Sequence, residues 1–169
     1  DTPVVVSIFP NFQEGRCVIG MAYVDLTKRV LGLAEFLDDS RFTNLESSLI
    51  ALGAKECIFP AETGKSNECK SLYDSLERCA VMITERKKHE FRGRDLDSDL
   101  KRLVKGNIEP VRDLISGFDL ATPALGALLS FSELLSDEGN YGNFTIRRYD
   151  ISGFMRLDSA AMRALNVME

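Results

Sequence analysis

The chain has 169 residues, of which 44% are apolar and 28% are charged, and its formal net charge at pH 7 is −5. This size and composition predict one globular domain that buries roughly 70% of the surface of its unfolded chain. No apolar run approaches the roughly 20 residues that a membrane-spanning helix needs, and the acidic balance argues against the whole chain as a nucleic-acid binder.

The first third of the sequence predicts three strands. Residues 4–9 are mostly β-branched, and residues 17–25 and 30–36 are further apolar runs of strand length. The links over 11–15 and 26–29 are short and polar. Parallel neighbours need a crossover of a dozen residues or more, so these links predict antiparallel hairpins.

Helices and strands then alternate. Apolar spacing over 42–52 predicts an amphipathic helix with Ser40 or Thr43 as its N-cap and Gly53 just beyond its end. The next predicted elements are a strand over 56–60, a helix over 66–78 and a strand over 80–84. Two such steps place these strands parallel in one sheet. The order βββαβαβ predicts an α/β fold with a mixed five-stranded sheet flanked by helices.

The second half of the sequence is mainly helical. Leu96, Leu100, Leu103 and Val104 predict one face of a helix, and residues 122–135 predict a helix that is buried on more than one side. Further predicted elements are a strand over 144–150 and a helix over 159–167 with Asp158 as its N-cap.

The charge is unevenly distributed. Residues 86–105 contain eight basic and four acidic residues, a net charge of +4, which leaves −9 for the remainder. Such a patch could contact phosphate, but interspersed acids are more typical of a solvated or protein-docking surface. Phe91 is the only aromatic residue there, which argues against single-strand binding by base stacking. The basic residues are Arg86, Lys87, Lys88, Arg92, Arg94, Lys101, Arg102 and Lys105.

Metal and nucleotide motifs are incomplete. Four cysteines, at 17, 57, 69 and 79, form no CxxC pair, and with His89 they are spaced too widely for a typical zinc site. We expect reduced thiols. Gly64-Lys65-Ser66 resembles the end of a phosphate-binding loop, but Phe59 occupies the position of the first glycine that such a loop needs.

A two-metal nuclease site is also incomplete. The βββαβαβ order is that of ribonuclease-H-like nucleases, which need carboxylates on the first strand, the first helix and the end of the fourth strand. Ser7 is the only polar residue of the first predicted strand, Glu46 lies on the first helix, and the fourth strand ends in Ile58-Phe59-Pro60. We therefore expect no catalytic centre, and no enzyme activity, in this chain.

The start, Asp1-Thr2-Pro3, has neither an initiator Met nor a signal-peptide pattern, so we expect a piece of a longer protein. Seven collinear runs extend over nearly the whole chain: GMAYVD (20–25), LGLAEF (31–36), FTNLE (42–46), GAKEC (53–57), ITERKK (83–88), FSELLS (131–136) and MRLDSAAMRALN (155–166). Together these runs resemble the connector domain, domain II, of the eukaryotic MutS homologues.

The resemblance implies a connector domain over residues 1–153 and the beginning of the lever region over 154–169. It implies a ribonuclease-H-like fold and a non-catalytic module linking the mismatch-binding and ATPase parts of a nuclear DNA mismatch repair protein. No cofactor is expected in this chain, while ATP and Mg²⁺ belong to the parent protein's ATPase domain. The implied partners are a MutL homologue, a repair exonuclease, a second MutS homologue as heterodimer mate and, through the parent protein, mismatched DNA.

The resemblance also suggests a docking surface. In bacterial relatives the MutL-contacting surface follows the last sheet strand, which aligns loosely with residues 99–107. The expected docking residues are therefore Leu100, Lys101, Arg102 and Lys105, beside a basic patch of Arg86, Lys87, Lys88, Arg92 and Arg94. The alternatives are that these residues only cap the sheet or face solvent, or that the chain is a divergent nuclease, a DNA-contacting module or a nucleotide-binding module using Lys65.

Overall fold

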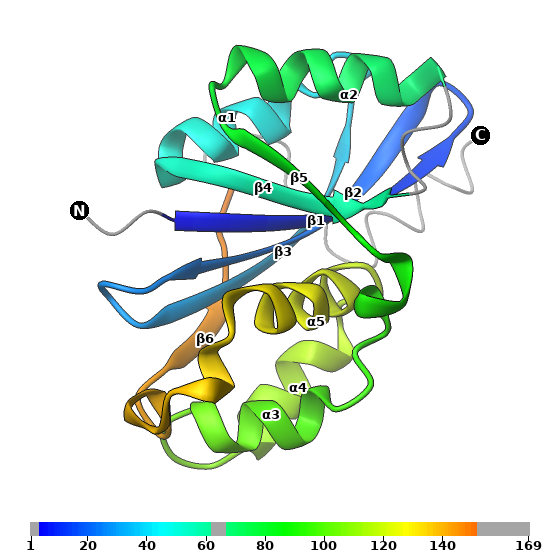
Figure 1. Ribbon diagram of the computed structural model, residues 1–169. Coiled ribbons are helices and arrows are strands. Elements are labelled where there is room, and N and C mark those ends of the chain that lie inside the picture. The colour runs from blue at the N-terminus through cyan, green and yellow to red at the C-terminus, as the bar shows by residue number, and fades with distance from the viewer. Residues whose placement is uncertain (1–3, 62–66, 152–169) are drawn as a thin grey trace.

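The computed structural model describes residues 4–61 and 67–151. Six strands form one mixed sheet in the order β5-β4-β1-β2-β3-β6 (Figure 1). The strands are β1 (Val4–Gln13), β2 (Arg16–Asp25), β3 (Val30–Asp38), β4 (Ala54–Pro60), β5 (Met82–Arg86) and β6 (Thr145–Arg148). The helices are α1 (Thr43–Leu52), α2 (Asn67–Arg78), α3 (Leu96–Leu103), α4 (Glu109–Ser116) and α5 (Ala121–Ser132), with short 3₁₀ turns η2 (Lys88–Arg92), η3 (Leu134–Ser136) and η4 (Glu138–Asn140).

The pairing of the strands confirms the predicted βββαβαβ order and the ribonuclease-H-like α/β class. β1, β2 and β3 form an antiparallel meander, β4 lies parallel to β1, and β5 lies parallel to β4. The predicted count of five strands is wrong by one. β6 pairs parallel with β3, with Val30 opposite Thr145, because the helical segment after β5 carries the chain across to the far edge of the sheet.

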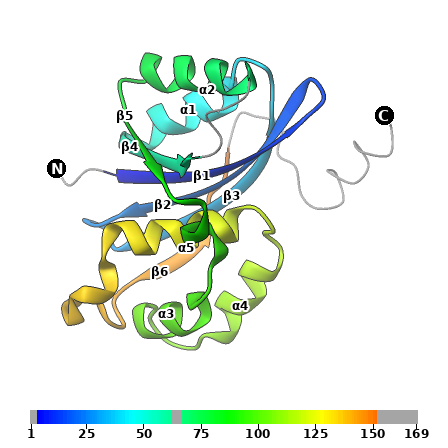
Figure 2. The ribbon, with the colours of Figure 1, turned by 45° about the vertical axis from the view of Figure 1, so that its right-hand side comes forward.

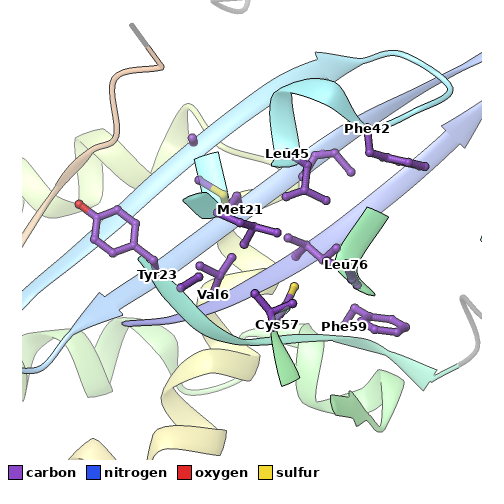
Figure 3. Packing of buried hydrophobic residues seen from close by; sticks show 14 of the residues in the cluster. Val6, Met21, Tyr23, Phe42, Leu45, Cys57, Phe59 and Leu76 are labelled. Carbon is purple, nitrogen blue, oxygen red and sulfur yellow. The ribbon is translucent and has the colours of Figure 1, made fainter. Parts of the chain in front are cut away.

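Helices cover both faces of the sheet (Figures 1 and 2). α1 and α2 cover one face, where strand residues such as Val6 and Cys57 are buried against Leu45 and Leu76 (Figure 3). α3, α4 and α5 cover the other face, where Ala22 and Val24 are buried. This alternation follows from the two-residue period of a strand and divides the core into two halves.

α5 lies closest to the sheet. Its residues Ala121, Ala124, Leu125, Ala127 and Leu128 have no exposed surface, which confirms the predicted helix buried on more than one side. A Cβ atom built at Gly20 of β2 would lie 2.2 Å from the backbone carbonyl carbon of Leu120. Glycine at this position therefore lets the first turn of α5 approach the sheet backbone directly.

The start of α1 differs from the prediction. Neither Ser40 nor Thr43 is its N-cap: Phe42 occupies that position with φ 57° and makes no side-chain cap bond. The left-handed turn at Phe42 instead brings the N–H groups of Asn44 and Leu45 to the carboxylate of Asp38, at 3.0 and 2.9 Å. Gly53 follows the helix with φ 66°, as predicted.

Other boundaries shift for identifiable reasons. β1 continues past Pro10, because beyond Ser7 it pairs with β2 alone and no ladder bond toward β4 is lost. The predicted helix over 122–135 ends at Ser132 and is followed by η3, and the sequence analysis missed both α4 and η2.

Some predictions fall outside the described residues. The Lys65 loop, the helix over 159–167 with its Asp158 cap, and the expected lever segment over 154–169 all lie there. Across residues 4–61 and 67–151, no helix combines the length and the apolar character that crossing a membrane requires.

Candidate functional site

The basic segment over 86–105 does not form one continuous patch. Its first part surrounds η2, at the end of β5, and its second part lies at the end of α3. Lys101 and Arg102 lie in the last turn of the eight-residue helix α3, at the opposite end of that helix from η2. We call Arg86, Lys87, Lys88, Arg92 and Arg94 the η2 cluster, and Lys101, Arg102 and Lys105 the α3-end cluster.

The α3-end cluster consists of exposed side chains on a fixed backbone. The backbone N–H of Lys105 donates to the carbonyl of Phe144 at 2.9 Å, and the carbonyl of Arg102 accepts from Gly142 at 2.8 Å. Lys101 and Arg102 occupy the last turn of α3, where cations are favoured by the helix dipole. These three cations therefore stand beside the start of β6 in a defined arrangement.

Leu100 does not belong to this surface. Its side chain is 1% exposed and packs in the core beneath α3. The structure thus corrects its inclusion among the docking residues: the spacing that places Leu96, Leu100 and Leu103 on one helix face also turns that face toward the sheet.

Arg86 forms its contacts with other residues of the domain. Its guanidinium donates to Glu90 at 2.6 Å and lies 5.2 Å from the centre of the Phe131 ring. Burial raises the pKa of Glu90, but the hydrogen bonds from Arg86 and Ser130 outweigh it, so the pKa lies below its usual value. Arg86 therefore fixes η2 against α5 and contributes little free charge to the η2 cluster.

α3 is fixed against α4 by a paired guanidinium. Arg112 donates to both carboxylate oxygens of Asp97, at 2.8 and 2.9 Å, and to Glu109 at 2.6 Å. The hydrogen bonds from Arg112 lower the pKa of Asp97. This bidentate geometry holds the helix that carries the α3-end cluster.

The residues considered for nuclease chemistry do not converge. Ser7 has no exposed surface and its hydroxyl has no hydrogen-bond partner in the structure. Glu46 binds Arg78 at 3.0 Å, and Ile58 and Phe59 are fully buried. Among the residues that the structure describes, no group of three or more His, Cys, Asp or Glu side chains is placed to hold a metal ion.

None of the four cysteines forms a disulfide bond. Burial raises the pKa of Cys57 and also that of Cys79. A raised pKa disfavours the thiolate, so neither side chain is an activated nucleophile.

Comparison with known proteins identifies close relatives. A family model described as MutS domain II matches residues 3–145. The chain is 94% identical over 169 residues to DNA mismatch repair protein MSH2 of Arabidopsis thaliana and 54% identical over 169 residues to MSH2 of Zea mays, covering 100% of this chain and 18% of each relative. MSH2 of Saccharomyces cerevisiae is 33% identical over 161 residues, which are 93% of this chain and 16% of that protein.

The chain thus spans less than a fifth of the length of these curated relatives. Among solved structures, it is similar to a Fowlpox virus resolvase in complex with Holliday junction DNA. That similarity has a TM-score of 0.47 and 14% identity and covers 79% of this chain and 99% of the resolvase.

Proposed function

The chain belongs to the MutS domain II family, and we propose that it serves a DNA mismatch repair protein as a non-catalytic connector between mismatch-binding and ATPase parts. The family match over residues 3–145 carries this proposal. In this role the chain itself holds no cofactor, and ATP and Mg²⁺ act in the ATPase domain of a longer nuclear protein. That protein contacts mismatched DNA and pairs with a second MutS homologue.

We further propose that the α3-end cluster docks a MutL homologue. Lys101, Arg102 and Lys105 are exposed, and the hydrogen bonds to the 142–144 segment hold their backbone in place. A fixed array of cations favours capture of an acidic surface, since complementary charge raises the rate of association. A repair exonuclease is a further partner for such a surface.

The test is a titration of the N-terminal half of a MutL homologue into isotope-labelled chain. We expect amide shifts concentrated on residues 101–107. The triple variant Lys101→Glu, Arg102→Glu, Lys105→Glu should weaken binding at least tenfold and leave the melting temperature nearly unchanged.

The matched control is Arg41→Glu, Lys55→Glu, Lys70→Glu, which makes the same change of net charge at exposed positions around α1, β4 and α2. The control should bind as the unmodified chain does. Equal losses in both variants would show that only net charge matters, and unaltered binding by the first would exclude this docking surface.

A further inference from the structure

A groove opens beside η2 at a characteristic position in the sheet. β4 and β5 are parallel, and their last residues, Pro60 and Arg86, lie opposite each other. α2, which follows β4, covers one face, whereas η2 and α3, which follow β5, lie on the other (Figure 1). Open α/β sheets bind ligands outside the carboxyl ends of strands whose connections leave to opposite faces.

The groove has an apolar floor and a cationic rim. Its volume is about 660 Å³, and it is lined by Phe9, Ala61, Lys87, Lys88, His89, Phe91 and Arg92. The rings of Phe9 and Phe91 stack with their centres 5.7 Å apart, while Lys87, His89 and Arg92 are exposed. We call this the η2 groove; none of its lining residues that the structure describes is a carboxylate.

Two of the cations on the rim, Lys87 and Arg92, form no ion pair within the described parts of the chain. Arg78, Arg86 and Arg112 each form an ion pair with a carboxylate. Within residues 4–61 and 67–151, no ion pair joins Lys87, His89 or Arg92 to an acid. In a chain of net charge −5, unneutralised cations around a hollow favour an anionic ligand.

The hollow on the other side of η2 is a useful contrast. It has a similar volume, about 710 Å³, but Glu90, Asp95 and Asp99 line it together with Arg92 and Arg94. Its three acidic residues outnumber its two arginines. The cationic character therefore belongs to the η2 groove alone of these two hollows.

The floor argues for a peptide rather than a nucleic acid. Phe91 is only 3% exposed, so its ring face is closed to a nucleotide base, and base stacking supplies much of single-strand affinity. The volume of the groove, about 660 Å³, lies within the range of pockets that bind a small ligand. An apolar side chain would match the apolar floor of the groove, and carboxylates on either side of it would match the cationic rim.

From these observations we propose that the η2 groove binds a short acidic peptide segment carrying one apolar side chain. The apolar side chain lies against Phe9 and Ala61, and the flanking carboxylates accept hydrogen bonds from Lys87 and Arg92. Carboxylate–guanidinium and carboxylate–ammonium bonds of this kind are among the stronger hydrogen bonds in proteins. The site is distinct from the α3-end cluster and could serve a separate partner.

The site is held in place before any ligand arrives. Glu90 accepts from Arg86 at 2.6 Å and from Ser130 at 3.2 Å, which joins η2 to α5. A Cβ atom at Gly126 would lie 2.9 Å from the Cα of Gly93, so α5 and the end of η2 are in close backbone contact. A preorganised site loses less entropy on binding.

The probe is a fluorescein-labelled peptide, Asp-Glu-Phe-Asp-Glu, titrated into the chain with anisotropy and amide shifts as readouts. We expect saturable binding and shifts centred on residues 87–92. The variant Lys87→Glu, Arg92→Glu should weaken binding at least tenfold. The matched control Arg41→Glu, Lys70→Glu makes the same change of net charge at exposed positions and should change binding less than twofold.

Three results would overturn the proposal. They are no binding, equal losses in both variants, or tighter binding at residues 87–92 of a single-stranded oligonucleotide of equal charge. A peptide with Ala in place of Phe should bind at least fivefold more weakly, and equal affinity would contradict the role of the floor. If the Glu variant loses its folded spectrum, Lys87→Gln, Arg92→Gln repeats the test without charge reversal.

Discussion

The two helix layers are attached to the same strand by different carboxylates. Asp38 and Glu35 both lie on β3, but they point to opposite faces because strand residues alternate. Asp38 accepts the N–H groups of Asn44 and Leu45 at the start of α1. Glu35 accepts those of Leu120 and Ala121 at the start of α5, at 2.6 and 2.9 Å. Each layer thus has a carboxylate at the positive end of a helix, buried for Asp38 and half-buried for Glu35.

The layers differ in what touches the sheet backbone. On the α1–α2 face, a Cβ atom at Gly32 would meet the ring of Tyr23, and on the α5 face one at Gly20 would meet the backbone of Leu120. A ring can rotate or shift, but a helix backbone moves only with its whole element. Adding a side chain at Gly20 on the α5 face should therefore cost more free energy of unfolding than adding one at Gly32 on the α1–α2 face, although both glycines are buried.

The largest expected effect tests this difference directly. Gly20→Ala should lower the free energy of unfolding by more than about 3 kcal/mol, because overpacking against backbone displaces α5. Gly32→Ala should cost less, about 1–2 kcal/mol. Urea denaturation measures both. Gly117→Ala is the control, since its new Cβ would lie at an ordinary 3.6 Å from Leu114; equal costs at positions 20 and 32 would remove the distinction between the faces.

The next effect concerns Asp38 and pH. Burial raises its pKa from 3.8 to about 6, although three backbone N–H groups oppose the shift. Between these values the folded state holds a proton that the unfolded state releases, so the contribution of Asp38 to stability is complete below pH 4 and is lost as pH rises through 6. The loss is at most about 3 kcal/mol.

Asp38→Asn cannot titrate and should lose this part of the pH dependence. The difference in unfolding free energy between the unmodified chain and the variant, measured at pH 4, 5, 6 and 7, should decrease steadily with pH. Parallel curves for the two proteins would mean that Asp38 titrates alike in the folded and unfolded states.

Glu35 should give a smaller effect on the opposite face. Burial raises the pKa of Glu35, and the N–H groups of Ala121 and Leu120 partly offset the shift. Glu35→Ala removes the acceptor of both N–H groups at the start of α5, so we expect a loss of about 1 kcal/mol at pH 7. Glu77→Ala, at an exposed position of α2, should change stability by less than about 0.5 kcal/mol; a loss as large as that of Glu35→Ala would refute the capping role.

The smallest expected effect is a gain. Ser7 on β1 is fully buried beneath α5 without a partner for its hydroxyl, so Ser7→Ala should raise the unfolding free energy by up to about 1 kcal/mol. Ser48 on α1 is nearly as buried but donates to the carbonyl of Asn44 at 2.9 Å. Ser48→Ala should therefore lower the free energy of unfolding by about 1 kcal/mol. Thermal or urea unfolding measures both variants, and a change of the same sign for Ser7→Ala and Ser48→Ala would contradict this prediction.

Much of the fold could be predicted from the sequence because its signals are local. Short polar links predict the hairpins, and apolar spacing predicts α1, α2, α3 and α5. α4 also has a usable signal, since Pro110 occupies its first turn and Val111, Leu114 and Ile115 have helical spacing. The cap of α1 was not predictable in this way, because Asp38 reaches the helix only through the left-handed turn at Phe42.

The candidate sites were less predictable because they depend on distant pairings. The basic segment is continuous in sequence, yet α3 divides it into two clusters and Leu100 belongs to the core. The η2 groove joins Phe9, Ala61 and residues 87–92. Only the pairing of β1 with β4 and of β4 with β5 brings these residues together, and no local pattern reports that.

For the connector role proposed above, the hydrogen bonds of β3 have a mechanical consequence. Because Asp38 and Glu35 of one strand bind the helices of both faces, displacing either layer shears the same strand. A shift of either layer must therefore either break these hydrogen bonds or move β3 with it. In the connector role proposed above, we expect the described part of the chain to turn as one body.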